Sequence, residues 1–279
     1  MIFKYGVIGH PIAHSRSPDI HLHFAKQENV ELSYEKILSP LDGFAHTAQQ
    51  FFHQGGLGVN ITVPFKHEAF LLADTLTERA QAAQSVNTLK KMPDGTLLGD
   101  TTDGEGIICD IQDNLNFSIT QKHVLILGAG GAVASIIEPL LLQRPASLVI
   151  VNRTLNKAQD LANRFAHWGA IKATSYDDLP KHKEAFDLVI NGTSSSLHEE
   201  QLPLPNDLFG STSMAYDMFY GSKPTSFLVW AQQHGAQYLA DGLGMLIEQA
   251  AASYYLWQGF MPNTQNVITQ LRAHLAQEN

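Results

Sequence analysis

The stretch of sequence that decides the fold spans residues 123–154 and reads HVLILGAGGAVASIIEPLLLQRPASLVIVNRT. It begins with an apolar run over 124–127 that has the length of a buried strand. A glycine cluster follows, then an apolar helical pattern to about Leu142, and then a second apolar run over 148–151. The pattern predicts a strand, a tight turn, a helix and a second, parallel strand joined by a right-handed crossover.

The turn of this unit consists of Gly128, Ala129, Gly130, Gly131 and Ala132. Glycines at a strand-to-helix turn let the backbone approach a pyrophosphate, and the following helix offers free N–H groups and the positive end of its dipole. The fingerprint G-x-G-x-x-G is incomplete, because Val133 stands in the place of its third glycine. The glycines alone therefore leave two interpretations open, a dinucleotide-binding turn and a turn with a structural role only.

The end of the second strand favours a phosphorylated dinucleotide. NAD-binding units place an Asp or Glu there, about 20 residues further on, to accept from the ribose 2′-hydroxyl. This sequence has Asn152, Arg153 and Thr154 instead, with Lys157 close behind. A guanidinium, a hydroxyl and an ammonium can hold a 2′-phosphate that a carboxylate would repel. A solvated helix start would also explain the two cations, but the macrodipole disfavours cations there, so we predict NADP rather than NAD.

The composition is that of a folded protein with an excess of acidic groups. Of its 279 residues, 44% are hydrophobic and 16% charged, which allows a sizeable core in one large or two ordinary domains. A net charge of −9 argues against nucleic acid or an anionic membrane as the partner. The single cysteine, Cys109, fits a reducing compartment, and the start of the chain does not resemble a signal peptide. No apolar run reaches about 18 residues, so we expect a soluble cytoplasmic protein.

The 13 histidines do not form a metal-binding pattern. His21 and His23 are two residues apart, so on a helix they point to different faces. The zinc-site spacing H-E-x-x-H and paired cysteines are missing from the sequence. We therefore expect no metal.

Strands and helices alternate from the first residue of the N-terminal half. Apolar runs over 2–8, 33–38 and 57–62 are separated by helical patterns that end near residues 29 and 54. This alternation predicts an α/β domain with a mostly parallel sheet. In such sheets, ligands bind outside the carboxyl ends of the strands.

Polar residues follow two of these predicted strands. Ser15 and Ser17 come after the first strand and could hold an anionic or hydroxylated ligand, although Ser17 before a proline is also a good N-cap. Asn60, Thr62 and Lys66 lie at the end of the third strand. A lysine in the first turn of a helix indicates a nearby acidic group or a surface position.

The second half continues the alternation. Further apolar runs over 170–173, 187–190, 213–218 and 237–240 bring the pattern after residue 123 to six predicted strands. Before it, Asp103 begins a helical pattern, either as an N-cap or as a catalytic carboxylate. Two helical patterns close the chain with no strand after them, so we expect them to pack on the first domain or to brace the hinge.

Eight short motifs occur in order at compatible spacing: HSRSP at 14–18, NITVPFK at 60–66, VNT at 86–88, TDG at 102–104, GAGGA at 128–132, NRT at 152–154, YDM at 216–218 and DGLGMLIEQA at 241–250. Each motif is weak alone, but the set is specific. Through it the chain resembles the shikimate dehydrogenase family along essentially its whole length.

The resemblance implies an α/β fold of two domains. A substrate-binding domain with a mostly parallel sheet would span 1–104, and an NADP-binding Rossmann domain 105–241. C-terminal helices over 242–279 would return to the substrate domain. The implied reaction is the reversible reduction of 3-dehydroshikimate to shikimate with NADPH, in aromatic amino-acid (chorismate) biosynthesis. The implied enzyme is a monomer or homodimer acting on a small molecule.

The resemblance also implies residue roles. Ser15 and Ser17, helped by Tyr216, would hold the substrate carboxylate, and the ring hydroxyls would meet Asn60, Thr62, Lys66, Asn87, Asp103 and Gln249. Lys66 and Asp103 would be the catalytic pair. This assignment agrees with the chemistry, because hydride transfer leaves negative charge on the ketone oxygen and a proton must follow.

The cofactor would be bound by the glycine turn, the end of the next strand and four later residues: Gly128, Ala129, Gly130, Gly131, Ala132, Asn152, Arg153, Thr154, Lys157, Thr193, Met218, Gly242 and Met245. Two alternatives stay open, a quinate/shikimate dehydrogenase with relaxed cofactor use and a catalytically silent protein that senses NADP or a metabolite. A short-chain dehydrogenase is disfavoured, because the sequence has no Tyr-x-x-x-Lys pair.

Overall fold

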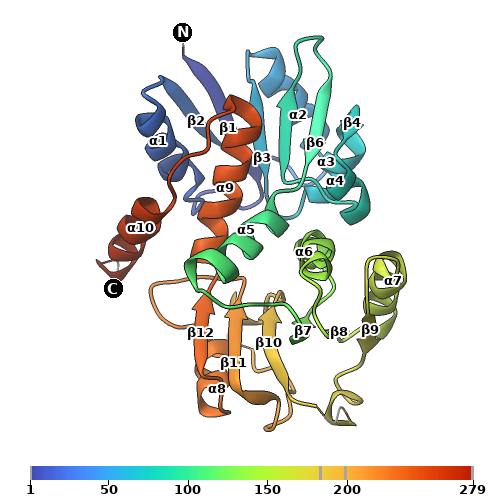
Figure 1. Ribbon diagram of the computed structural model, residues 1–279. Helices are drawn as coiled ribbons and strands as arrows, with labels where there is room; N and C mark the ends of the chain where they lie inside the picture. The colour runs from blue at the N-terminus through green and yellow to red at the C-terminus, as the bar shows by residue number, and fades with distance from the viewer. Residues whose placement is uncertain (1, 182–183, 198–199, 278–279) are drawn as a thin grey trace.

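The computed structural model describes residues 2–181, 184–197 and 200–277 and contains two sheets, one above the other in Figure 1. The upper, N-terminal sheet has six strands in the order β2-β1-β3-β5-β6-β4. Their bounds, in that order, are Leu32–Leu38, Phe3–Gly9, Gly58–Ile61, Thr88–Lys91, Leu97–Asp100 and Thr75–Leu76. Strand β5 runs antiparallel to both of its neighbours, and the other strands share one direction. The sheet is therefore mostly parallel, as the sequence predicts.

Helices cover both faces of this sheet, with the bounds α1 Ser17–Glu28, α2 Phe44–His53, α3 Lys66–Leu72, α4 Glu78–Ala83, α9 Leu243–Gln258 and α10 Gln265–Gln277. Successive residues of a strand point to opposite faces. In β1, Tyr5 stacks on Trp257 of α9 with ring centroids 4.6 Å apart. Its neighbour Gly6 faces Phe51 of α2. Helices α2 and α9 therefore lie on opposite faces of the sheet.

The last two helices lie against the first one (Figure 1). Apolar side chains of α1, α9 and α10 form one buried cluster, which includes Ile20, Phe24, Ile247, Tyr254 and Leu271. The end of the chain thus packs on its beginning, and burial of these side chains holds it there.

The second sheet has six strands in the order β12-β11-β10-β7-β8-β9, and all of its pairs are parallel. Their bounds, in that order, are Tyr238–Asp241, Phe209–Asp217, Phe186–Asn191, His123–Leu127, Ser147–Val151 and Ile171–Thr174. Their main crossover helices are α6 Gly131–Leu142, α7 Leu155–Phe165 and α8 Ser226–Gln233. Numbered from β7, the order is 6-5-4-1-2-3, which is the strand order of the dinucleotide-binding Rossmann fold.

Strand β7 is apolar throughout because both of its faces are covered. Val124 and Ile126 belong to one buried cluster, on the side of α6. Leu125 and Leu127 belong to another, together with Trp230 of α8. A strand in the middle of a parallel sheet therefore reads as a continuous apolar run instead of an alternating one.

Helix α5, Asp103–Cys109, continues into a π-helical turn, Asp110–Asn114, and crosses between the two sheets (Figure 1). It packs against both α6 and α9. A Cβ on Gly104 would lie 2.3 Å from Cγ of Pro139 in α6, so only glycine permits this approach. Because α5 contacts both halves of the molecule, domain boundaries at residues 104 and 241 stay predictions.

The N-cap interpretations of Ser17 and Asp103 are each wrong by one residue. Both are the first helical residues of their helices, and the N-cap positions are held by Arg16 and Thr102. The Ser17 hydroxyl does not cap the helix but accepts a hydrogen bond from Ser15 Oγ at 3.2 Å. Both side chains are thus free of the structural role that the sequence offered for them.

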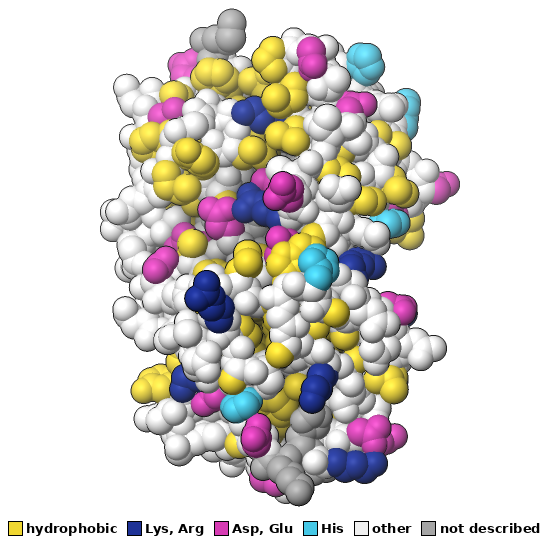
Figure 2. Space-filling view, turned by 45° about the vertical axis from the view of Figure 1, so that its right-hand side comes forward, with side chains coloured by type: hydrophobic (Ala, Val, Ile, Leu, Met, Phe, Trp, Pro, Cys, Tyr) yellow, Lys and Arg dark blue, Asp and Glu magenta, His cyan; other side chains and the backbone are white. Residues whose placement is uncertain are grey.

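Short 3₁₀ turns, Leu179–Lys181 and Ser195–Leu197, join elements of the second sheet. Over residues 2–181, 184–197 and 200–277, no helix is both long and apolar enough to cross a membrane. Figure 2 shows Lys and Arg side chains scattered between Asp and Glu side chains on one face of the molecule. That face carries no continuous basic patch among the side chains described.

Candidate active site

The polar residues that follow the strands meet at one edge of the N-terminal sheet. Strands β1, β3 and β6 share a direction, so the segments 10–17, 62–66 and 101–103 all leave the sheet at the same edge. Strand β5 runs the other way, so Asn87, which precedes it, lies at this edge as well. The direction of the strands thus gathers side chains that are far apart in the sequence.

Lys66 and Asp103 form a close pair at this edge. Lys66 Nζ donates a hydrogen bond to Asp103 Oδ2 at 2.5 Å, and 18% and 8% of the two side-chain surfaces are exposed. The helix dipole favours a carboxylate at the start of α5 and disfavours an ammonium at the start of α3, so the pairing removes the mismatch at Lys66. Part of the Lys66 side chain is exposed, so the pair is not closed off from solvent.

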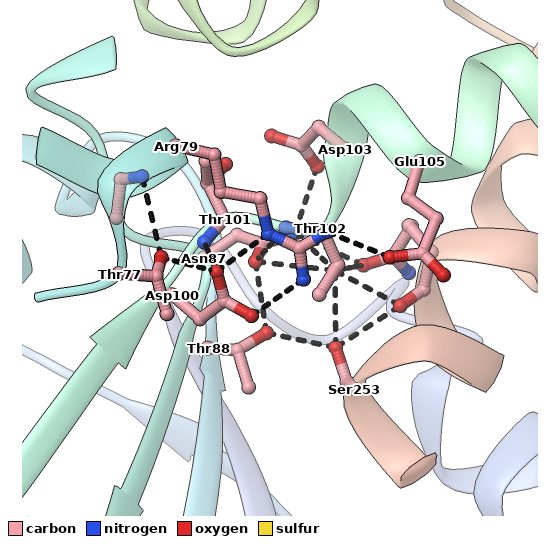
Figure 3. A network of polar contacts seen from close by, with 12 residues as sticks. Thr77, Arg79, Asn87, Thr88, Asp100, Thr101, Thr102, Asp103, Glu105 and Ser253 are labelled. Atoms are coloured by element: carbon pink, nitrogen blue, oxygen red, sulfur yellow. Dashed lines mark hydrogen bonds and ion pairs between the residues drawn. The ribbon is translucent and has the colours of Figure 1, made fainter. Parts of the chain in front are cut away.

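Asn87 ties this pair to helix α9 (Figure 3). Its Nδ2 atom lies 2.9 Å from Asp103 Oδ1 and 3.2 Å from Gln249 Oε1. Its Oδ1 atom accepts from the Thr88 hydroxyl at 2.8 Å and from the Thr102 backbone N–H at 3.0 Å. The amide is 2% exposed, so its orientation is fixed by these partners.

Ser253 is a buried centre of the same network that sequence reasoning missed. Its hydroxyl lies 2.7 Å from Thr88 Oγ1, 3.1 Å from Thr102 Oγ1 and 3.0 Å from Asn60 Nδ2. It also donates to the backbone carbonyl of Gln249 at 3.0 Å. Spacing held the signal, since Ser253 follows Gln249 by one helical turn and shares its face.

Asn60 lies in β3 with little exposed surface. Its Oδ1 atom accepts from the Tyr34 hydroxyl at 2.7 Å, while Nδ2 faces Ser253 and the segment before β5. These contacts fix the orientation of the Asn60 amide at the sheet edge. Thr62 stands beside this position, half-buried, with its methyl group against Gly9. Tyr34 is a second participant that the sequence did not indicate.

Ser15 and Ser17 lie together at the start of α1. Ser15 Oγ accepts from the Ser17 backbone N–H at 3.3 Å and donates to the Ser17 hydroxyl at 3.2 Å. The N-cap residue of this 12-residue helix, Arg16, makes no side-chain capping hydrogen bond. Free N–H groups, two hydroxyls and the positive end of the dipole together fit a carboxylate.

The expected role of Tyr216 is wrong. Tyr216 is 0% exposed and its hydroxyl donates to Asp110 Oδ2 at 2.7 Å, so it cannot meet a substrate carboxylate. Burial raises the pKa of Asp110, and the hydrogen bonds from Asn114 and Tyr216 oppose this rise. Tyr220, four residues further on, is half-buried and packs against the cluster of α1 and α9 that contains Ile20. Tyr220 is therefore the better placed of the two tyrosines.

The glycine turn lies next to this network. Gly128 has a φ of +108°, a backbone conformation that favours glycine, and a Cβ on Gly130 would meet nothing within 4 Å. No described side chain caps α6, so its first N–H groups face this open space. Ser85 Oγ lies 3.7 Å from the position of a Cβ on Gly131, and Ser85 is two residues from Asn87. The turn thus fits a pyrophosphate beside the Lys66 site.

The end of β8 offers positive charge beside this turn. Arg153, Thr154 and Lys157 are exposed where β8 ends, next to β7 in the sheet. Asn152 turns its amide back to donate to the Thr154 carbonyl at 2.9 Å. Two exposed cations at this position fit the 2′-phosphate of NADP.

The four remaining cofactor candidates lie at the same edge of the second sheet or just behind it. Thr193 packs against Gly128, with Cγ2 3.1 Å from the position of a Cβ. A Cβ on Gly242 would lie 2.2 Å from the Met218 carbonyl oxygen, so glycine permits the close approach of these segments. Met245 is 6% exposed and belongs to the core, so it offers little surface to a ligand.

The described histidines form no metal site. No group of three or more His, Cys, Asp or Glu side chains that could hold a metal ion is found among the described residues. His21 is fully buried and stacks on Tyr34, with ring centroids 4.5 Å apart. Neither ring nitrogen has a hydrogen-bond partner among the described residues. Burial lowers the pKa of His21 to about 3, and the Asn60 side chain only partly offsets this fall.

Three family models match the chain in the order of its parts. They are the shikimate dehydrogenase substrate binding domain over 7–89, shikimate / quinate 5-dehydrogenase over 111–200, and the shikimate 5′-dehydrogenase C-terminal domain over 242–272. A shikimate dehydrogenase (NADP(+)) from Laribacter hongkongensis is 53% identical over 272 residues, which are 98% of each chain. The chain belongs to the shikimate dehydrogenase family.

Solved structures agree with membership of the shikimate dehydrogenase family. An Ael1 enzyme from Pseudomonas putida superposes with a TM-score of 0.90 at 43% identity and covers 96% of this chain and 98% of its own. A shikimate dehydrogenase from Thermus thermophilus, solved with NADP(H) and shikimate, has a TM-score of 0.84 at 29% identity and covers 98% and 100%. The family and the α/β fold class predicted from the sequence are confirmed.

Proposed function

We propose that this chain catalyses the reversible, NADPH-dependent reduction of 3-dehydroshikimate to shikimate, a step of aromatic amino-acid (chorismate) biosynthesis. The observation that carries the proposal is the 2.5 Å contact between Lys66 Nζ and Asp103 Oδ2, close to the glycine turn. The names and bound ligands of the relatives support it, because they include NADP(+)-dependent shikimate dehydrogenases and a complex with NADP(H) and shikimate.

Lys66 is the proposed proton donor. NADPH, when bound, supplies the hydride that reaches the ketone carbon. Negative charge then develops on the ketone oxygen, where the Lys66 ammonium stabilises it and delivers a proton. Asp103 keeps Nζ in position and accepts a hydrogen bond from the neighbouring ring hydroxyl. In the oxidation of shikimate, the same lysine takes the proton back.

The substrate would lie along the edge of the N-terminal sheet. Its carboxylate would meet Ser15, Ser17 and the start of α1, with Tyr220 in the place that the sequence assigned to Tyr216. Its ring hydroxyls would meet Asn60, Thr62, Lys66, Asn87, Asp103 and Gln249. Ser253 and Tyr34 would support these residues without contacting the substrate, because their hydroxyls form hydrogen bonds with the amide of Asn60.

The cofactor would lie along the carboxyl edge of the second sheet. Its pyrophosphate would contact the turn 128–132, and its 2′-phosphate would contact Arg153, Thr154 and Lys157. Residues 152–154, at the end of β8, include no carboxylate, which disfavours NAD. Thr193, Met218, Gly242 and Met245 would border the nicotinamide half.

The remaining proposals concern organisation and setting. We propose a substrate-binding domain over 1–104, a Rossmann domain over 105–241 and C-terminal helices over 242–279 that brace the first domain. The net charge of −9 supports a small-molecule substrate without a nucleic-acid or membrane partner. A single cysteine and a biosynthetic role support a cytoplasmic location. The proposed oligomeric state is a monomer or a homodimer.

The test is an initial-rate assay that combines shikimate or quinate with NADP⁺ or NAD⁺. We expect high rates with shikimate and NADP⁺ alone. Comparable rates with quinate would point to a quinate/shikimate dehydrogenase, and comparable rates with NAD⁺ would contradict the role of Arg153. Binding of both ligands without any change in nicotinamide absorbance would favour the silent sensor instead.

A further inference from the structure

The short segment that carries Asp103 is held at both ends by one side chain, Arg79 of α4 (Figure 3). Arg79 donates from Nε to Asp100 Oδ1 at 2.7 Å and from Nη2 to Asp100 Oδ2 at 2.6 Å. Its third nitrogen, Nη1, donates to Glu105 Oε2 at 2.7 Å. Asp100 ends β6 and Glu105 lies in the first turn of α5, so Arg79 spans the turn between them.

The Asp100 end of this bridge is the more strongly fixed. Asp100 is 1% exposed and also accepts from the Thr77 hydroxyl at 2.6 Å and from the Thr101 N–H at 2.8 Å. Burial alone would raise the pKa of Asp100, but the hydrogen bonds and charge of Arg79, with Thr77 and Thr101, lower it overall. A bidentate pair with a planar guanidinium also fixes direction, which a single point charge does not.

Because Glu105 lies in α5, its hydrogen bond to Arg79 also restrains the position of α5 relative to Asp100. Asp103 lies between the two carboxylates that Arg79 binds, at the first residue of the helix. The carboxylate of Asp103 itself is bound by Lys66 at Oδ2 and by Asn87 at Oδ1. A shift of α5 along its axis would therefore move the carboxylate of Asp103 relative to Lys66, and Arg79 opposes that shift.

Arg79 itself lies outside the proposed substrate site. With Glu105 it lines two surface hollows of about 570 and 540 Å³, and none of their other lining residues is proposed to touch substrate. Its position in the first turn of α4 is unfavourable for a cation unless acids are near, the same signal that marked Lys66. The signal was present in the sequence but pointed to no partner there.

We propose that Arg79 is a positioning residue for the reaction: by binding Asp100 and Glu105 together, it sets the place of the Asp103 carboxylate against Lys66. The inference rests on the proposed function, in which Lys66 and Asp103 handle the proton. A bridge that only stabilised the fold would have the same contacts, so the experiment must separate positioning from stability.

The experiment compares shikimate oxidation by Arg79→Gln, Arg79→Lys, Glu105→Ala and Asp103→Asn. Arg79→Gln leaves Asp100 buried without its cation, so Glu105→Ala, which cuts only the half-exposed end of the bridge, serves as the milder variant. Lys122→Gln is the matched control. Lys122 pairs with Asp187 at the N-terminal end of β7, at the other end of this strand from the glycine turn. Its side chain is 32% exposed, close to the 33% of Arg79. The readouts are kcat per folded enzyme, KM for shikimate, the pH profile of kcat and the Tm.

We expect Glu105→Ala and Arg79→Gln to lower kcat by about 10-fold, within the loss of up to about 100-fold that a 1 Å misplacement costs. KM for shikimate should change less, and the pH profile should shift because the Lys66–Asp103 contact loosens. Arg79→Lys, which can bind one carboxylate at a time, should recover part of the loss. Lys122→Gln should keep the kcat and the pH profile of the unmodified enzyme.

Unchanged kcat and pH profile in Glu105→Ala would overturn the positioning role, even if the Tm falls. Should Arg79→Gln fail to fold, Glu105→Ala and Arg79→Lys decide the matter. Asp103→Asn separates a failure of the inference about Arg79 from a failure of the proposed function. If Asp103→Asn keeps full kcat, the proposed proton-handling pair is wrong; if Asp103→Asn is slow and the Arg79 and Glu105 variants are not, only the inference about Arg79 is wrong.

Discussion

The Nζ atom of Lys66 lies 2.5 Å from Oδ2 of Asp103, although 37 positions separate the two residues in the chain. Each is the first residue of a helix, α3 and α5, that follows a strand of the same sheet. Because these strands run in one direction, the two helices begin at the same edge. The contact is thus a product of sheet topology, and it places an ammonium and a carboxylate where a ligand can reach both.

Lys66→Ala should lower kcat for shikimate oxidation by about 10²–10⁴, the usual range for loss of a general acid or base. The physical reason is that the substrate oxygen then has no lysine side chain to stabilise its negative charge or to exchange a proton with it. KM for shikimate should change less, because other side chains still bind the ring hydroxyls. Steady-state kinetics with saturating NADP⁺ measure both quantities.

Ser15→Ala is the control for this prediction. Ser15 is proposed to hold the carboxylate in substrate and transition state alike, so its loss should raise KM more than it lowers kcat. A kcat loss in Ser15→Ala as large as that in Lys66→Ala, or a change in KM alone in Lys66→Ala, would contradict the assigned roles.

Arg153→Ala should raise KM for NADP⁺ by about 10-fold and leave KM for NAD⁺ nearly unchanged. The guanidinium is exposed at the end of β8, so it contributes a charge-assisted hydrogen bond of modest strength, about 1.5 kcal/mol, to the 2′-phosphate that only NADP⁺ carries. The measurement is the ratio of kcat/KM for the two cofactors. Arg144→Ala removes the same charge beyond the opposite end of α6 and should leave this ratio unchanged. Equal losses with both cofactors would show that Arg153 does not read the phosphate.

Tyr216→Phe and Tyr220→Phe should separate a structural from a binding hydroxyl. Loss of the Tyr216 hydroxyl removes the hydrogen bond to Oδ2 of the buried Asp110 carboxylate, so we expect a loss of about 1–3 kcal/mol in unfolding free energy and an unchanged KM for shikimate. Tyr220→Phe should raise KM for shikimate with a small effect on stability. Urea unfolding and steady-state kinetics on both variants test this, and a raised KM in Tyr216→Phe would restore the original assignment.

Much of the fold could be predicted because local sequence and topology agree. The unit over 123–154 has apolar runs, glycines and a helix of matching lengths, and the observed strands and helix fall within a few residues of the predicted ones. Lys66 could be singled out because a cation in a first helical turn is unfavourable unless an acidic group is near or the side chain lies at the surface. Such signals are local. Local signals suffice to predict helices and strands and to identify single charges in electrostatically unfavourable positions.

The roles of the missed residues depend on packing, which sequence spacing alone does not establish. Tyr216 and Tyr220 are four residues apart, and only the structure shows that β11 buries the first and releases the second. Ser253 reads as an ordinary small residue of an apolar helix, yet it contacts two strands. Arg79 carried the same signal as Lys66, but its two acids lie beyond β5 in the chain and were not connected with it.

His21→Phe should flatten the pH dependence of stability between pH 7 and pH 5. His21 is fully buried with a pKa lowered to about 3, whereas in the unfolded chain it titrates near 6.5. Below about pH 6.5 the unfolded state therefore binds a proton that the folded state excludes, and stability is lost as pH falls from there toward 3. At about 1.36 kcal/mol per pH unit, the loss from this group amounts to roughly 2 kcal/mol at pH 5.

Phenylalanine keeps the stacking on Tyr34 and removes the titrating nitrogens, so the variant should not show this loss. Urea unfolding at pH 7, 6 and 5 gives the difference between the two proteins, in which the contributions of other acids cancel. His23→Phe is the matched control, because His23 lies on the same helix with its ring nitrogen bonded to the Asp19 carbonyl near the surface. This control shows how much the exchange of a histidine for phenylalanine on α1 changes the slope by itself. The same slope for His21→Phe as for this control would mean that the buried ring takes up a proton in the folded state.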